Sequence, residues 1–136
     1  MKKPLLILIF SILIISFQSC KDASHTPDQV SEIELISPQQ VYDAVHNEDS
    51  VQLVDVRTSE EFLESHLKGA QNICVTRSDF KEKIKTLDKD KPVYLYCKIG
   101  GRSARAARIL KEMGFKKVYD MDGGITLWNE KNLMLE

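Results

Sequence analysis

The chain has 136 residues, 43% hydrophobic and 29% charged, which is enough for one domain with a buried core and unlike a disordered or fibrous chain. Its 19 basic and 20 acidic residues give a net charge of −1, which argues against a protein held on nucleic acid by bulk charge. The three cysteines, Cys20, Cys74 and Cys97, are too few and too scattered for a disulfide framework or a four-ligand zinc site.

The first segment of the chain has the pattern of an export signal. Lys2 and Lys3 precede an apolar run of 13 residues, Leu5 to Phe17. A helix of that length spans roughly 20 Å, less than the ~30 Å hydrocarbon core of a bilayer. The segment therefore predicts a secretory signal rather than a lasting transmembrane helix.

A cysteine, Cys20, directly follows a small residue at the end of this apolar run, in the order Phe17-Gln18-Ser19-Cys20. This resembles the bacterial lipobox, in which the cysteine thiol receives diacylglycerol and becomes the new N-terminus. The resemblance implies a signal peptide over residues 1–19, a polar tether over 20–32, and a cell-envelope protein on the periplasmic or surface side, anchored to a membrane through lipid on Cys20. An ordinary secretory signal cleaved elsewhere and an uncleaved membrane anchor are the alternatives.

Residues 33–136 predict one domain in which strands and helices alternate. We expect strands over residues 34–36, 51–56, 70–75, 93–96 and 117–121, and helices from 38, from 59 through 62, and over 78–87, 101–113 and 125–131. This alternation is typical of an α/β domain with a mostly parallel central sheet flanked by helices. Because chemistry in such sheets gathers at the carboxyl ends of the strands, the candidates are Asp55-Val56-Arg57 and Cys97.

The segment Cys97-Lys98-Ile99-Gly100-Gly101-Arg102-Ser103 joins a predicted strand directly to a strong helix. A tight loop at a helix N-terminus turns several backbone N–H groups toward one point and forms an anion-binding nest. The nest and the helix dipole should lower the pKa of a thiol there, and Lys98 and Arg102 add positive charge. The loop therefore favours an anionic sulfur and an anionic substrate, whereas a merely buried Cys97 would leave its composition unexplained.

The pattern Cys97-x-x-Gly100-x-Arg102-Ser103 resembles the active-site loop of rhodanese-type sulfurtransferases. Other signatures of that family have counterparts in the same order: Asp55-Val56-Arg57 with Glu60-Glu61-Phe62, His66-Leu67-Lys68-Gly69-Ala70, and Gly123-Gly124-Ile125 with Trp128. Lys68 stands where many relatives have proline. The resemblance covers about residues 33–133 and implies a single rhodanese-like domain.

The resemblance also implies a reaction. The Cys97 thiolate would take a sulfane sulfur from thiosulfate or a persulfide, hold it as a persulfide, and pass it to a thiol or cyanide. Backbone N–H groups from Ile99 to Ser103 would stabilise the charge, while Lys98 and Arg102 orient the donor. No metal or organic cofactor is expected, and a protein partner in a sulfur relay is left open. We also expect an exposed Cys97 that is at risk of oxidation.

Other residues are weaker candidates. Asp55 and Arg57 could face the Cys97 pocket, but an ion pair that fixes their loop is the favoured interpretation. His66 and Trp128 are expected to be structural, and Cys74 to be buried rather than a resolving thiol for Cys97.

Two other functions remain open. A phosphatase or arsenate reductase also holds a cysteine in an anion-binding loop, but related phosphatases place five residues between Cys and Arg, whereas Cys97 and Arg102 enclose four. A non-catalytic rhodanese-like binding module is the other alternative, although such modules commonly lack the cysteine. The sequence does not distinguish among sulfur donors and acceptors.

Overall fold

Strands and helices alternate throughout residues 32–48 and 50–135, the part of the chain that the computed structural model describes. The predicted signal peptide and Cys20 lie outside these residues. In chain order the elements are β1 (Glu32–Ile36), α1 (Pro38–Asn47), β2 (Gln52–Asp55), α2 (Ser59–Glu64), β3 (Gln71–Asn72), α3 (Phe80–Ile84), β4 (Val93–Tyr96), α4 (Gly101–Glu112), β5 (Lys117–Met121) and α5 (Gly124–Glu130).

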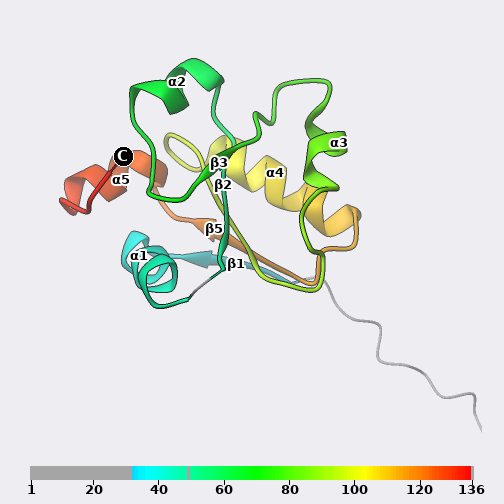
Figure 1. Cartoon of the computed structure of the whole chain (residues 1–136), viewed down its shortest axis with the longest axis horizontal. Helices are drawn as coiled ribbons and strands as arrows, with labels where there is room; N and C mark the ends of the chain where they lie inside the picture. Colours follow the sequence, from blue (N-terminus) through cyan, green and yellow to red (C-terminus); the bar gives the residue numbers. More distant parts are fainter. Residues whose placement is uncertain (1–31, 49, 136) are drawn as a thin grey trace, which may run out of the picture.

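The five strands form one sheet in the order β1-β5-β4-β2-β3, and every neighbouring pair is parallel (Figure 1). The strand β4 lies at the centre, and all four of its residues, Val93–Tyr96, are buried. A continuous apolar run is what a strand covered on both faces requires. The central position of β4 places the loop that follows it, beginning at Cys97, in the middle of the carboxyl edge of the sheet.

Helices cover both faces of the sheet and make two separate cores. The helices α3 and α4 pack on one face, where Phe80, Ile84 and Leu110 join a cluster that includes Cys97. On the other face, α1 and α5 pack together and contribute Val41 and Trp128 to the second cluster. The predicted α/β architecture with helices on both sides of a parallel sheet is therefore confirmed.

The helix starts follow from their capping residues. Ser37 and Gln40 form a capping box at the start of α1, with Pro38 at its first position. Thr58 and Glu61 form a second capping box at the start of α2. Each box satisfies backbone N–H groups that have no partner within the helix, which helps even the six-residue α2 to form.

The sequence predictions differ from the structure mainly at the sheet edge and in α3. The strand predicted over residues 70–75 is only Gln71–Asn72, and the helix predicted over 78–87 is only Phe80–Ile84. After α3 the backbone N–H groups of residues 85–87 bond to carbonyls three residues earlier, so the helix tightens into turns. The first strand begins at Glu32, which the sequence assigned to the tether. No helix among the described residues is long and apolar enough to cross a membrane.

Candidate functional site

The sulfur of Cys97 lies inside the loop that joins β4 to α4. Gly100 donates its backbone N–H to Cys97 Sγ at 3.1 Å, which closes the loop around the sulfur. Gly100 has φ +110°, a left-handed conformation that favours glycine, and it immediately precedes the first residue of α4. The loop therefore takes the shape that the sequence predicted, with a thiol at the N-terminus of a twelve-residue helix.

Several donors around the sulfur change its acidity. Burial of Cys97 by itself would raise the pKa of its thiol, but hydrogen bonds from the Ser103 hydroxyl and from the N–H groups of Ser103, Gly100 and Ile99 outweigh it. The net result is a Cys97 pKa below the ordinary value of a thiol. This arrangement favours a thiolate, the nucleophilic form of cysteine.

The expectation that Cys97 is exposed is wrong. Only 1% of its surface is accessible, and it belongs to the core cluster on the α4 face. The neighbouring loop residues Lys98 and Ile99 are exposed instead, Ile99 to 71%. The reactive atom is therefore held under the loop, and the side chains at the loop surface would meet an incoming molecule first.

The start of α5 holds the other side of the Cys97 loop. Ile125 donates its N–H to the Cys97 carbonyl at 2.9 Å, and Thr126 donates to the Lys98 carbonyl at 3.1 Å. A Cβ atom on Gly124 would lie 2.6 Å from the Lys98 carbonyl carbon and oxygen, so only a glycine allows this approach. The Gly123-Gly124 pair thus lets α5 pack directly against the backbone of the candidate site.

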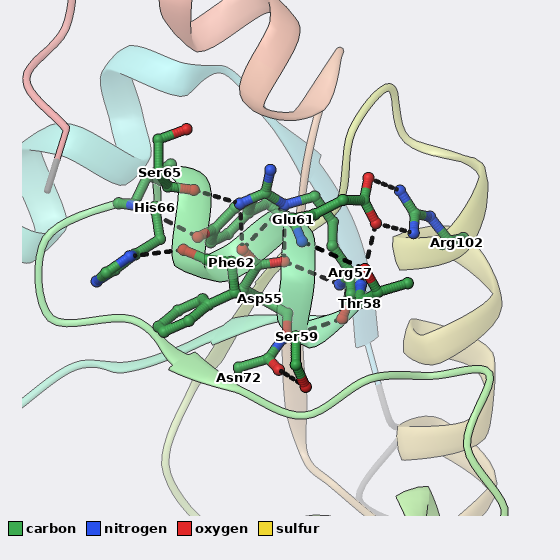
Figure 2. A network of polar contacts seen from close by, with 12 residues as sticks. Asp55, Arg57, Thr58, Ser59, Glu61, Phe62, Ser65, His66, Asn72 and Arg102 are labelled. Atoms are coloured by element: carbon green, nitrogen blue, oxygen red, sulfur yellow. Dashed lines mark hydrogen bonds and ion pairs between the residues drawn. The ribbon is translucent and has the colours of Figure 1, made fainter.

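Arg102 is paired with an acidic residue of the chain itself. Its guanidinium forms two short bonds to the carboxylate of Glu61 on α2, at 2.6 and 2.7 Å (Figure 2). This pairing, opposed by partial burial and helped by the Thr58 N–H, lowers the pKa of Glu61 to about 2. The sequence analysis assigned the positive charge of Arg102 to binding of the sulfur donor, but this charge is already paired with the Glu61 carboxylate. Lys98 forms no ion pair with the described residues.

Asp55 and Arg57 form a buried ion pair at the end of β2. Arg57 donates from Nε and from a terminal nitrogen to the Asp55 carboxylate, and that terminal nitrogen also donates to the Ser65 carbonyl at 2.7 Å (Figure 2). The Arg57 guanidinium lies 5.6 Å from the centre of the Tyr96 ring. These contacts tie the loop after β2 to the segment that follows α2, as the favoured structural interpretation predicts.

The remaining candidates lie in structural positions. His66 Nδ1 is 3.0 Å from the Phe62 carbonyl oxygen, and its ring stacks on the Phe62 ring. Trp128 is buried and donates its indole N–H to the Met134 carbonyl. Cys74 is a free, buried cysteine whose Sγ lies 3.2 Å from the Thr76 hydroxyl. Among the described residues, no group of three His, Cys, Asp or Glu side chains could hold a metal ion.

Sequence reasoning missed two members of the site, Glu61 and Gly124, although both lie in motifs that it quoted. The capping box identifies Glu61 as a helix-start residue, and nothing near it points to a partner 41 residues further along the chain. The backbone contact of Gly124 with the Cys97 loop likewise depends on how α5 packs, which local sequence does not contain.

The chain is similar in sequence to known proteins. Residues 37–131 match the family model described as the rhodanese-like domain. Thiosulfate sulfurtransferase GlpE of Shewanella oneidensis is 39% identical over 82 residues, which cover 60% of this chain and 79% of that protein. The uncharacterized protein YqhL of Bacillus subtilis is 42% identical over 80 residues, which cover 59% of this chain but 62% of YqhL, less than two thirds of its length.

Solved structures of related proteins are also similar to this chain in fold. A rhodanese-related protein from Thermoplasma volcanium superposes with a TM-score of 0.66 at 28% identity, covering 76% of this chain and 97% of that one. The polysulfide-sulfur transferase homodimer of Wolinella succinogenes gives a TM-score of 0.65 at 28% identity, covering 76% and 78%. With the family match running from the cap of α1 to the end of α5 and including the whole Cys97 loop, the chain belongs to the rhodanese-like domain family.

Proposed function

We propose that the domain is a sulfurtransferase that carries a sulfane sulfur as a persulfide on Cys97. The observation that supports this most is the hydrogen bond from the Gly100 N–H to Cys97 Sγ at 3.1 Å, together with the other donors that lower the pKa of the thiol. Relatives named thiosulfate sulfurtransferase match the same part of the chain.

The reaction has two displacement steps. The Cys97 thiolate attacks the outer sulfur of a donor such as thiosulfate, the sulfur–sulfur bond of the donor breaks, and sulfite leaves with the bonding electrons. A thiol or cyanide then attacks the outer sulfur of the persulfide, and the Cys97 thiolate leaves. The N–H groups of Ile99, Gly100 and Ser103 would stabilise the negative charge in both states, since Gly100 already donates to the sulfur and all three lower the pKa of the thiol.

Purified protein should convert thiosulfate and cyanide into thiocyanate, and Cys97→Ser should abolish this conversion. Cys74→Ser is the matched control, because it changes the other described buried thiol and should leave turnover intact. Wild-type protein that fails with thiosulfate, persulfides and mercaptopyruvate alike, yet hydrolyses an aryl phosphate, would overturn the proposal in favour of the phosphatase alternative.

We also propose that the protein acts at a membrane of the cell envelope, held there by lipid on Cys20. The support is the sequence alone, an apolar run that ends in Ser19-Cys20 and is followed by a polar segment. Two or three acyl chains make such an anchor stable, whereas one gives only marginal binding. Cys20→Ala should move the protein from the membrane fraction to the soluble one without changing its activity per molecule. An unmodified Cys20 in the mature protein, found by mass spectrometry, would contradict the anchor.

A further inference from the structure

Asp120, on β5, is a buried carboxylic acid without an ion-pair partner among the described residues. It is 4% exposed, and its Oδ1 is a buried atom with no hydrogen-bond partner in this part of the chain. The residues in register with it on the two neighbouring strands are Leu35 and Leu95, so the sheet supplies no charge. Burial of a carboxyl group in such surroundings costs free energy.

One polar group that acts on this carboxyl belongs to the candidate site. Ser103, in the first turn of α4, is fully buried, and its hydroxyl lies near enough to the Asp120 carboxyl and to the Cys97 sulfur to lower the pKa of each. In the structure this hydroxyl donates its proton to the Gly100 carbonyl oxygen, at 3.0 Å. A serine hydroxyl has a single proton to donate, so these acceptors compete for it.

No hydrogen bond joins Asp120 Oδ1 to the Cys97 sulfur, whose backbone donor within the loop is Gly100. It is in register with Leu95, two residues before Cys97 on the neighbouring strand. With strands ~4.8 Å apart and a rise of ~3.3 Å per residue, the Cα atoms of Asp120 and Cys97 are roughly 8 Å apart. Any influence of the carboxyl on the thiol must therefore pass through Ser103 or through charge.

We propose that Asp120 is a positioning residue of the Cys97 site and that its carboxyl determines whether the Ser103 hydroxyl donates to the Cys97 sulfur. A protonated carboxyl donates to Ser103 Oγ and leaves the serine proton for the sulfur. An ionised carboxyl accepts the serine proton and adds negative charge beside the thiolate. The inference rests on the proposed role of Cys97 as the reacting thiol.

Burial and the polar and charged groups around Asp120 together set the pH at which its carboxyl changes from the protonated to the ionised state. Burial raises the pKa of its carboxyl, the Ser103 hydroxyl lowers it, the charge of Asp122 raises it and that of Arg108 on α4 lowers it, with a net rise. Each state of the carboxyl should consequently shift the titration of Cys97, because titrations of interacting groups are coupled.

The test is the rate at which iodoacetamide alkylates Cys97 as a function of pH, measured on the Cys97 peptide of the full chain by mass spectrometry. Asp120→Asn keeps the size of the side chain, cannot ionise, and has an amide that can donate permanently to Ser103. We expect the pKa of Cys97 to fall by about one pH unit, which is about tenfold more thiolate on the acidic side of the titration. Alkylation does not require sulfur transfer, so this result is independent of whether the proposed function is correct.

Ser103→Ala provides the second arm. It should raise the pKa of Cys97, and adding Asp120→Asn to it should then lower that pKa by less than Asp120→Asn does alone, because only the effect of the lost charge remains once the connecting hydroxyl is gone. Asp122→Asn is the control, since it removes a charge near Asp120 but should shift the pKa of Cys97 equally with and without Ser103. A Cys97 pKa unchanged by Asp120→Asn, or changed equally in the Ser103→Ala background, would overturn the proposal, even if the variant were less stable.

Discussion

The approach of α5 to the Cys97 loop makes Gly124 the position where one methyl group should do the most damage. Gly124 has φ +56°, and in Gly124→Ala the new Cβ would lie 2.6 Å from the Lys98 carbonyl carbon and oxygen. Both neighbours are backbone atoms, so no side chain can rotate away. The loop must move instead, together with the bonds from Ile125 and Thr126 that hold it.

The expected loss of stability has two parts. A non-glycine residue in the left-handed region costs ~1–2 kcal/mol, and overpacking against atoms that cannot relax costs ~1–3 kcal/mol. Gly124→Ala should therefore lower the free energy of unfolding by about 2–5 kcal/mol. Gly69→Ala is a matched control, because Gly69 has φ +75° but no atom within 4 Å of an added Cβ, so only the first part applies.

Urea denaturation of both variants measures these differences, and alkylation of Cys97 reports on the loop. Gly124→Ala should lose more stability than Gly69→Ala and should also slow the reaction of Cys97 at neutral pH, because a displaced loop no longer aims its N–H groups at the sulfur. Equal losses in the two variants, with Cys97 reactivity unchanged in both, would refute the idea that α5 fixes the loop through Gly124.

Three further predictions concern the charged groups of the site. Asp55→Asn leaves Arg57 buried without its carboxylate and should lower the free energy of unfolding by about 3–5 kcal/mol in urea. Because the pKa of Glu61 is lowered from 4.5 to about 2, its pairing with Arg102 stabilises the protein above pH 4.5, and this contribution is lost as the pH falls toward 2; acid titrations of Glu61→Gln should lack that loss. Lys98→Ala should reduce kcat/KM for thiosulfate by roughly ten- to hundredfold, mostly through KM, whereas Arg102→Ala should do less in steady-state assays since Glu61 already pairs with Arg102.

Local sequence predicted best those elements whose signals are local. The strands β4 and β5 have the predicted bounds, and α4 begins at Gly101 as expected. The continuous apolar run of β4 and the glycine loop before α4 are strong local signals by themselves. The edge strand β3 is shorter than its apolar segment, although Ile73 and Val75 still donate N–H groups to the carbonyls of Asp55 and Val56 beyond the strand. The extent of an edge strand depends on its single neighbour, which its own sequence does not describe.

The candidate site shows the same division. The thiol, the glycines and the helix start lie within seven consecutive residues, so their joint chemistry can be predicted from the segment that begins at Cys97. The partner of Arg102 lies on α2, the contact of Gly124 comes from α5, and Asp120 approaches from β5. These three depend on packing between distant segments, and so does the burial of Cys97, which the sequence predicted wrongly.

The central claim is that Cys97 carries the transferred sulfur, and intact-protein mass spectrometry after addition of thiosulfate tests it most directly. We predict that the protein gains the mass of one sulfur atom, that the added sulfur maps to the Cys97 peptide, and that cyanide removes it with release of thiocyanate. Addition of the sulfur to Cys74 instead, or turnover to thiocyanate in Cys97→Ser, would contradict the claim.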